Sequence, residues 1–437
     1  MSDAGASQRP AATAGAGKLI LLPGRDIFAK QGGSESYVTA HAKAAIMAGF
    51  EPHLFTVARH PAVLETDFGV IHRIGSPIPA RMMGARLYRQ SLVAAMTQFL
   101  GGEPGAHVLH GFGGWADAAV AGARRLRRRG ITAVPVVTVW STVEHEAWGK
   151  VRDPMVRTSL RPLARYLLEY AWVRCVAAPC EHRTYRASAA VIINYDSVRA
   201  LLEQAVGPGL PITRLPYAAP LAFADPLPTP PLPEPLVSFG DPDAALIVST
   251  SRHDGRKGLD VLIRALARLR DAGRPFRACL VGTGVMLEPH RRLVRSLGLE
   301  QHVLLPGLVP AVLPYLAHAD VYTLPSIEEG SGAVSVLEAL QCGATIVASA
   351  VDGIPEDLTD GDDALLVPPG QAEPLARALE LLLASPERRA RLGARARATF
   401  ERRFTAQQAA RAIAELYAGL GIIAPTGSRL ARTASTT

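Results

Sequence analysis

The sequence predicts an α/β protein built from two doubly wound domains in tandem, each with a mostly parallel sheet covered by helices. Short apolar runs alternate with amphipathic helical stretches along most of the chain, and this alternation is typical of parallel sheets. Between residues 221 and 244 the pattern gives way to dense proline. Proline lacks a backbone donor and fixes φ, so we expect a linker there.

The first expected domain covers residues 18–220. It opens with the buried strand KLILLPG, followed by the glycine-rich loop and helix of FAKQGGSESYVTAHAKAAIMAGF and by the strand PHLFTVA. This order predicts a βαβ unit, with the helix ending near Gly49. Further strands are expected at HVLH, AVPVVTVW and AVIIN, with helices at RMMGARLYRQSLVAAMTQFL and RPLARYLLEYAWVRC.

The second expected domain covers residues 245–400. Its strands are expected at ALIVSTS, FRACLVG, HVLLPG, VYTLPS, TIVAS and ALLVPP, with helices such as GLDVLIRALARLRDAG and VSVLEALQCG. A helical run from Pro374 to Leu420 follows, and its part at 401–424 is expected to pack back on the first domain. The small, polar ends at 1–17 and 425–437 predict disordered tails.

The composition is that of a soluble globular protein, with 48% hydrophobic and 20% charged residues in a chain of 437. No apolar run reaches the ~18 residues expected of a membrane span. The formal charge of +8 suits an anionic partner, whether a phosphate-bearing small molecule, anionic lipid or nucleic acid. Four scattered cysteines fit neither a disulfide scaffold nor a common zinc spacing, so we expect buried free thiols.

Loops that follow strands are the places to look for a site, because ligands bind beyond the carboxyl ends of strands in open α/β sheets. After ALIVST, the loop SRHDGRKGLD carries Arg252 and Lys257. A guanidinium and an ammonium together suit a diphosphate. An ordinary solvated loop is the alternative, and this loop alone favours the alternative.

The stretch EEGSGAVSVLEALQCG, which follows the strand VYTLPS, is the richest in candidate site residues. Gly330 and Gly332 permit a tight turn, and backbone amides at the start of the next helix, at Gly332 and Val334, can face an anion. Glu338, inside that helix, could accept hydrogen bonds from ribose hydroxyls. Glu328 or Glu329 could meet sugar hydroxyls. Alternatively, these two acids favour the helix macrodipole, which explains them better than it explains Glu338.

Two other glycine motifs are weaker signals. QGGSES, with Gly32 and Gly33, follows the first strand closely and could bring amides to a phosphate or sugar. CLVGTGVMLEP has GxG after a strand but lacks the third glycine of a dinucleotide fingerprint, so a tight turn is the better interpretation.

Taken in order, these motifs resemble a known family. Gly32 and Gly33, Arg252 with Lys257, GTG, LLPGLV, LPYLAHADVYTLPSIEEG, LEALQCGATIVAS and VDGIPEDLTDGDDALLVPPG are similar to the retaining glycosyltransferases of family 4, which have the GT-B fold. The likeness runs from about Lys18 to about Phe404 and is dense after Ser249.

The resemblance implies roles for these residues. Arg252 and Lys257 would hold the diphosphate of a nucleoside-diphosphate sugar, Glu338 the ribose, and an acid of the EEGSG turn the transferred sugar. Gly32 and Gly33 would lie across a cleft between the domains. No metal or other cofactor is implied, since the basic pair and helix amides neutralise the leaving diphosphate.

The chain departs from the family pattern in two places. Eight residues separate Glu329 from Glu338, whereas the family usually has seven; LEALQCG makes Glu338 the safer assignment, and either Glu329 or Glu328 could reach the sugar. Where the family commonly has a histidine, AVPVVTVWSTVEHEAW has Trp140. His145 and His110 are candidates to replace that histidine, although a lone histidine is more often structural.

The leading hypothesis is therefore a cytoplasmic, bacterial, metal-independent glycosyltransferase acting on an unidentified acceptor, such as an envelope glycan or lipid or a secondary metabolite. A catalytically silent homologue that binds nucleotide sugar or acts as the partner subunit of an active protein is an alternative, and a nicotinamide-dependent oxidoreductase is a weaker one. The arginine-rich stretch GARRLRRRG (122–130) is expected to be a solvated helix end. It could also hold the protein against anionic lipid at the inner membrane face. Nucleic acid is not an expected partner.

Overall fold

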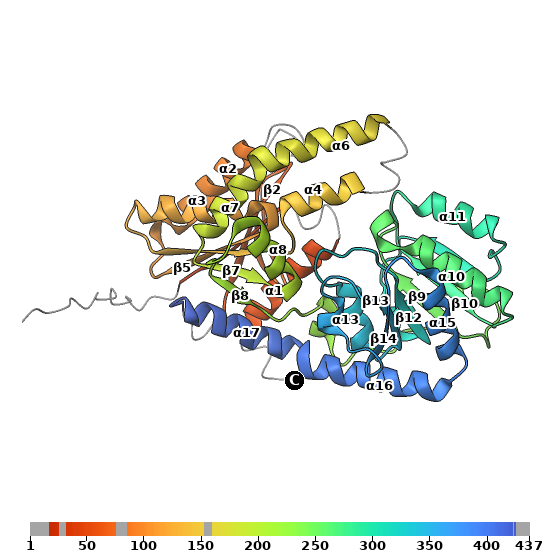
Figure 1. Ribbon diagram of the computed structural model, residues 1–437. Coiled ribbons are helices and arrows are strands. Elements are labelled where there is room, and N and C mark those ends of the chain that lie inside the picture. The colour runs from red at the N-terminus through yellow and green to blue at the C-terminus, as the bar shows by residue number, and fades with distance from the viewer. Residues whose placement is uncertain (1–16, 26–31, 76–84, 153–159, 423, 425–437) are drawn as a thin grey trace, which may run out of the picture. The chain divides into compact units, whose positions relative to one another are not determined.

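The computed structural model describes residues 17–25, 32–75, 85–152, 160–422 and 424. The chain divides into two compact units that are not continuous in sequence. The first unit comprises Met1–Thr138, Arg183–Ile192 and Ala410–Thr437, and the second comprises Val139–His182 and Ile193–Ala409. Two sheets with helices beside them make an α/β structure, which confirms the expected fold class (Figure 1).

The larger sheet has eight strands in the order β3-β4-β2-β1-β5-β6-β7-β8. Its strands are β1 (Leu19–Arg25), β2 (Pro52–Ala58), β3 (Ala62–Thr66), β4 (Gly69–Gly75), β5 (His107–Phe112), β6 (Ala133–Thr138), β7 (Ala190–Ile193) and β8 (Ile212–Arg214). The βαβ opening is confirmed, because β1 and β2 pair in parallel on either side of α1 in the sequence. The β3–β4 pair is an antiparallel hairpin that the helix-strand alternation did not predict.

The helices along the first unit lie where the sequence predicted them, except the one at 178–186, which was not predicted. They are α1 (Gly33–Met47), α2 (Ala85–Phe99), α3 (Ala116–Arg127), the end of α7 (Ala178–Arg186) and most of α17 (Ala406–Gly419), with short 3₁₀ turns η1 (Leu100–Gly102) and η2 (Gly113–Trp115). Leucines and alanines of α2 and α3 share a buried cluster with strand residues such as Ile20 and Phe55. This cluster is the core beneath one face of the larger sheet.

The smaller sheet has the order β11-β10-β9-β12-β13-β14. Its strands are β9 (Leu246–Thr250), β10 (Arg277–Val281), β11 (Val303–Gly307), β12 (Val321–Leu324), β13 (Ile346–Ser349) and β14 (Ala364–Val367). All of its strand pairs are parallel. Leu262 and Leu266 of α10 and Leu379 of α15 pack in one cluster with strand residues such as Ile247. The buried apolar faces of these helices therefore stabilise the sheet.

The second unit contains most of the remaining helices. They are α4 (Val143–Arg152), α6 (Leu160–Trp172) with the π-helical turn η3 (Val173–Ala177), α8 (Asp196–Val206), η4 (Pro220–Ala224), α9 (Glu234–Val237), η5 (Gly255–Lys257), α10 (Leu259–Asp271), α11 (Leu287–Ser296), α12 (Leu313–Ala317), α13 (Val334–Gln341), α14 (Ile354–Asp357), α15 (Ala372–Leu383) and α16 (Pro386–Arg403). In the proline-rich stretch the helices are the short η4 and α9.

The helical run expected from Pro374 to Leu420 is three helices, α15, α16 and α17. Side-chain caps mark both breaks. Ser385 accepts a hydrogen bond from the Arg388 amide at 3.2 Å, and Thr405 accepts one from the Gln408 amide at 3.3 Å. These hydroxyls satisfy donors that a helix start leaves free. Residues from Ala410 onward belong to the first unit.

The strand order of the smaller sheet reverses between β9 and β12. From β9 the chain proceeds to β10 and β11 on one side, and then returns to β12, β13 and β14 on the other. Ligands in open α/β sheets bind at such a switch point, beyond the carboxyl ends of the strands. The loops after β9, β12 and β13 are therefore the structural candidates for a site.

The expectation of buried thiols is wrong for two of the four cysteines. Cys279 is buried and Cys342 half-buried, but Cys175 and Cys180 are exposed. Both lie in a helical segment whose outer side is exposed along several turns. Within the described part of the chain, no helix is both long enough and apolar enough to cross a membrane.

Candidate functional site

The loop after β9 carries the two cations that the sequence assigned to a diphosphate. Arg252 has a side chain that is 57% exposed, and its Nη2 lies 3.3 Å from Asp254 Oδ2. The GTG turn supports this loop, because the His253 amide donates a hydrogen bond to the Thr283 carbonyl at 3.0 Å. The GTG motif is thus a supporting turn, as the sequence indicated, and Arg252 remains open to a ligand.

The loops after β9 and β12 are joined by backbone and side-chain contacts. The Arg256 carbonyl accepts hydrogen bonds from the amides of Ile327 and Glu328, at 2.7 and 3.2 Å. Lys257 Nζ lies 2.6 Å from Glu329 Oε2, and the side chains of these two residues are only 16% and 4% exposed. Glu329 also accepts a hydrogen bond from the Ser326 hydroxyl. Lys257 therefore meets a carboxylate of the neighbouring loop.

The two adjacent glutamates have different surroundings. Glu329 is enclosed by Lys257 and Ser326, whereas Glu328 faces α4. His145 Nε2 lies 3.3 Å from Glu328 Oε1, and Arg256 Nη1 lies 3.7 Å from the same oxygen. The Glu328 carboxylate is the main cause of a raised pKa of His145, with smaller contributions from the charges of Glu146 and Asp352, while burial opposes the rise.

The loop after β13 braces the EEGSG turn through Asp352. Asp352 Oδ2 accepts hydrogen bonds from the amides of Glu329 and Gly330, at 2.7 and 2.8 Å. A third bond runs from the Gly353 amide to the Ser331 carbonyl at 2.9 Å. The anion that these amides face in this structure is thus the Asp352 carboxylate.

The two glycines of the EEGSG turn are required for different reasons. Gly330 has φ +77°, which a residue with a Cβ seldom adopts. A Cβ at Gly332 would lie 2.0 Å from the Tyr195 hydroxyl oxygen, so Gly332 permits close packing. Tyr195 in turn donates to Asp357 Oδ2 at 2.7 Å. Burial raises the pKa of Asp357 to about 7, although this hydrogen bond opposes the rise.

Helix α13 carries the last two predicted residues. Val334 is its first residue and is half-buried, and Glu338 follows one turn later. The Glu338 carboxylate has no hydrogen bond or ion pair to a residue in the described segments, and burial raises its pKa to about 7. Helix α13 is regular, whereas Gly330 has a left-handed backbone. The irregular backbone between Glu329 and Glu338 therefore lies in the loop and not in the helix.

The remaining glycine candidates and one histidine candidate belong to the first unit. Gly32 and Gly33, at the start of α1, and His110, in β5, belong to the first unit. Both ring nitrogens of His110 are engaged, Nδ1 with the Tyr417 hydroxyl at 2.8 Å and Nε2 with Thr138 Oγ1 at 2.7 Å. Burial and the neighbouring His41 hold the pKa of His110 well below its usual range. This arrangement suits a neutral structural histidine.

Trp140 and His145 follow β6 along the chain. The His145 side chain contacts Glu328 of the EEGSG turn. Of the two candidate histidines, His145 is therefore the one that the structure places at this turn. Trp140 is half-buried. Its role in place of the family's usual histidine stays a prediction.

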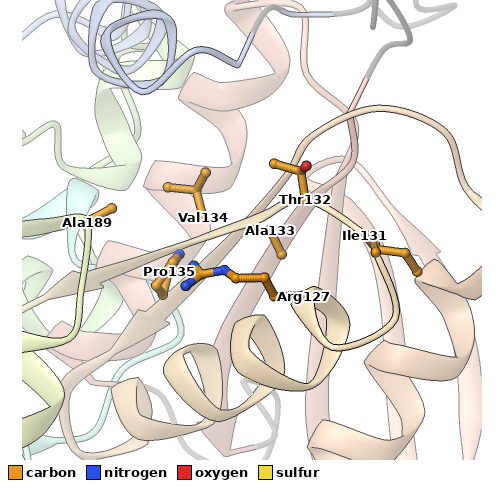
Figure 2. A pocket seen from close by; sticks show the side chains of 8 residues that line it. Arg127, Ile131, Thr132, Ala133, Val134, Pro135 and Ala189 are labelled. Atoms are coloured by element: carbon orange, nitrogen blue, oxygen red, sulfur yellow. The ribbon is translucent and has the colours of Figure 1, made fainter. Parts of the chain in front are cut away.

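The first unit contains a cavity. It has a volume of about 350 Å³ and lies at the amino end of β6, lined by Arg127, Gly130, Ile131, Thr132, Ala133, Val134, Pro135 and Ala189. Figure 2 shows the Arg127 side chain extending toward Pro135. Because ligands bind at the carboxyl ends of parallel strands, we do not assign the donor to this cavity. No group of three or more potential metal ligands occurs among the described residues.

Three residues of the site were missed from the sequence: Asp352, Arg256 and Tyr195. Asp352 lies in a DG pair, a turn signal that tolerates a left-handed backbone, and its φ is +49°. That signal could have indicated a turn but not which amides its carboxylate meets. Arg256 contributes a carbonyl, and Tyr195 lies far away in sequence, so neither left a local pattern.

Two family models match the chain. The model described as "Glycosyl transferases group 1" matches residues 238–399, which include the three site loops. The model described as "Glycosyl transferase 4-like domain" matches residues 32–218. The two matches are consecutive along the chain, as expected for two α/β domains in tandem.

Individual proteins give the same indication. A GDP-mannose-dependent alpha-(1-6)-phosphatidylinositol monomannoside mannosyltransferase of Mycolicibacterium smegmatis is 36% identical over 163 residues, 36% of this chain and 43% of that protein. The chain spans between 34% and 50% of the length of the first curated relatives that it matches.

Solved structures share the fold. Sucrose-phosphate synthase from Thermosynechococcus elongatus has a TM-score of 0.70 at 22% identity, over 93% of this chain and 99% of that one. HepE of Anabaena, in complex with UDP, has a TM-score of 0.63 at 18% identity, over 92% of this chain and 100% of that one.

Proposed function

The chain belongs to the group 1 glycosyltransferases of family GT4, which have the GT-B fold, and we propose that it transfers a sugar from a nucleoside diphosphate to an acceptor with retention of configuration. The observation that carries this proposal is the junction of loops at the switch point of the smaller sheet. There Lys257, from the loop after β9, meets Glu329, from the loop after β12.

Each part of the proposed donor has a suitable group in these loops. Arg252 is exposed, and its planar guanidinium can bind phosphate oxygens in a bidentate manner. Lys257 has further N–H donors besides the one directed at Glu329, so it can bind the diphosphate without leaving that carboxylate. The Glu338 carboxylate, which has no partner in the described segments, would accept hydrogen bonds from the ribose.

The sugar would lie against the EEGSG turn. Glu329 is fixed by Lys257 and Ser326, so its carboxylate is held in place before a substrate arrives, which reduces the cost of reorganisation. Glu328, beside His145, is the second acid of this turn. We propose Glu329 as the sugar-binding acid, because its side chain connects the turn to the proposed diphosphate site.

Departure of the nucleoside diphosphate is the step that needs charge stabilisation. An oxocarbenium-like sugar forms as the bond from its anomeric carbon to the phosphate oxygen lengthens. Arg252 and Lys257 would neutralise the leaving diphosphate, so we propose that the reaction needs no metal. Full activity after exhaustive treatment with a chelator is the expected result, and activity restored only by added Mg²⁺ or Mn²⁺ would contradict it.

The proposal is tested by donor turnover. UDP-glucose and GDP-mannose are the first donors to try, because UDP is bound by one structural neighbour and GDP-mannose is named for one relative. We expect release of the nucleoside diphosphate in the presence of a suitable lipid or glycan acceptor. Glu329→Gln should lower kcat by about a hundredfold, as loss of a group acting in the transition state does, while the matched surface variant Glu373→Gln should keep full activity.

A partner of the second unit is suggested by the outer face of α6 and of the π-helical turn η3 that follows it. Leu168, Trp172 and Val176 follow one another at helical spacing and are 73%, 59% and 47% exposed. Arg161 and Arg165 are exposed on the same helix. Basic residues beside exposed apolar ones, with a tryptophan among them, are typical of helices that lie on an anionic membrane surface.

We therefore propose that α6 binds the surface of an anionic membrane. A second copy of the chain is a poorer fit, because it would bring the same arginines together. The cluster at 124–129, at the end of α3, is exposed as the sequence predicted. It lacks large exposed apolar side chains in the described residues, so we expect it to contribute less.

Vesicle sedimentation tests this partner. The wild type should bind phosphatidylglycerol vesicles and not phosphatidylcholine vesicles, and Leu168→Glu with Trp172→Glu should abolish binding. Val285→Glu is the matched control, since Val285 is an isolated apolar residue that is 86% exposed. Equal binding by the double variant, or a concentration-dependent dimer that the same double variant abolishes, would contradict the proposal.

A further inference from the structure

Asp352 is an unusual residue at the centre of the proposed donor site. It is the only residue other than glycine with a positive φ, +49°, in the described segments. Such a conformation costs energy and persists only where the surroundings hold it. Here one carboxylate oxygen accepts two backbone N–H groups, at 2.7 and 2.8 Å from the amides of Glu329 and Gly330.

Those two amides are a place where an anion can bind. Successive N–H groups directed at one point form a concave anion site, often called a nest. In this chain the nest is filled from within, by a carboxylate that follows the neighbouring strand β13. The distances are typical of hydrogen bonds to a charged acceptor. A phosphate or a ligand carboxylate would have to displace Asp352 to use these amides.

The charged side chains around the turn also disfavour an acidic ligand. Besides Asp352, the carboxylates of Glu328 and Glu329 lie on the turn itself. Lys257 already forms an ion pair with Glu329. His145 and Arg256 lie beside Glu328, and Arg256 Nη1 is also 3.6 Å from Glu146. The cations next to the EEGSG turn are thus each matched by a carboxylate. Among the described residues, the turn offers acceptors for hydroxyl groups and no unpaired cation for an acidic group.

We propose that Asp352 determines donor specificity, by reserving the EEGSG turn for a neutral sugar and excluding a uronic acid. This inference rests on the proposed function, because it assumes that the transferred sugar lies against this turn. A neutral hexose presents hydroxyls, which can donate to the carboxylates. A uronate would place its own carboxylate against three others, and it would find the two amides already occupied.

The test compares neutral and acidic donors of the same base. Competition binding is measured for UDP-glucose against UDP-glucuronic acid, and for GDP-mannose against GDP-mannuronic acid. The wild type should bind the neutral member of the pair at least about tenfold more tightly, a difference that corresponds to about 1.4 kcal/mol. Affinity for the bare nucleoside diphosphate supplies the reference in every variant.

Three variants separate charge from structure. Asp352→Gly suits the positive φ and frees both amides, so the preference for the neutral donor should fall at least about fivefold. Asp352→Asn keeps an oxygen acceptor, tolerates the left-handed backbone and removes the charge, so it should also lower the preference. Asp362→Asn is the control, because Asp362 is a surface carboxylate of the same unit that pairs with Arg395.

Each outcome decides the matter. Wild-type protein that binds nucleoside diphosphate but takes both donors equally well overturns the inference and leaves the proposed function standing. An unchanged preference in a folded Asp352→Asn or Asp352→Gly protein also overturns it. If none of UDP, GDP, ADP and dTDP binds, the proposed function fails and the inference fails with it. Thermal melting identifies a variant that does not fold, and the other variant then decides.

Discussion

The Glu338 carboxyl is buried and has no hydrogen-bond or ion-pair partner among the described residues, so its ionisation should be visible in the stability of the protein. Its pKa rises from the usual 4.5 to about 7 because burial disfavours the charged form. The folded state therefore holds a proton that the unfolded state has lost. The free energy of unfolding should fall as pH rises from about 4.5 to about 7, by at most about 3 kcal/mol for this one group.

Glu338→Gln removes that dependence. The variant should be more stable than the wild type above pH 7, while the two should converge at acidic pH, where the wild-type carboxyl is protonated. Denaturant unfolding at several pH values measures this difference. If the difference in stability between the wild type and the variant does not vary with pH, burial does not raise the pKa of Glu338.

The stability contribution of His145 changes with pH in the same direction. Its pKa is raised from 6.5, chiefly by the Glu328 carboxylate, so the charged pair stabilises the fold fully below about pH 6.5 and this contribution is lost as pH rises through the folded pKa. His145→Ala should cost about 1 kcal/mol at pH 5.5 and less at pH 8.5. Glu328→Gln should show the same trend, and a larger cost at alkaline pH would contradict the pairing.

At the scale of elements, the three loops at the carboxyl edge of the smaller sheet form one connected unit. The Lys257–Glu329 ion pair joins two of them, and both side chains are largely buried. Removing one partner of a buried pair leaves an uncompensated charge, so Lys257→Met should destabilise the second unit by about 3 kcal/mol. Glu329→Gln in the same chain should recover part of the loss.

A double-mutant cycle measures this coupling. Denaturant unfolding of the wild type, both single variants and the double variant should give an interaction energy of about 1 kcal/mol or more. Arg268 and Glu373 form a surface pair of the same unit, with side chains 56% and 45% exposed, and they provide the matched control. Additive effects at Lys257 and Glu329 would mean that the loops are held together by the backbone contacts alone.

The elements show what local sequence pattern can and cannot predict. Strands and helices of the smaller sheet followed from apolar runs and helical periodicity, since both depend on near neighbours. The β3–β4 hairpin was missed, and the run from Pro374 was read as continuous although caps at Ser385 and Thr405 interrupt it. Caps are local signals that were present but were not used.

The site was predictable to the extent that it depends on position after a strand. Arg252, Lys257, Glu329 and Glu338 all follow strands of one sheet or lie in the next helix, so their shared edge could be expected. The Asp352 bonds to the EEGSG turn could not, because the two segments meet only through the parallel pairing of β12 and β13. The packing of Tyr195 against Gly332 also left no pattern, because these two residues lie far apart in the sequence.

For the whole molecule, the central claim is that the second unit binds a nucleoside diphosphate at the switch point of its sheet. The comparisons establish the family and the fold. The identities of the base, the sugar and the acceptor depend instead on individual side-chain contacts with the substrates. UDP, GDP, ADP and dTDP differ only in the base and its sugar, so their affinities test the site before any acceptor is known.

Calorimetric titration of these four nucleotides is the most direct measurement, with the wild type, Arg252→Ala, Glu338→Ala and the surface control Arg268→Ala. We predict that one nucleotide binds, that Arg252→Ala and Glu338→Ala each weaken it by about tenfold or more, and that the control does not. Absence of binding by all four, or binding that neither substitution weakens, would contradict the assignment of the donor to these loops.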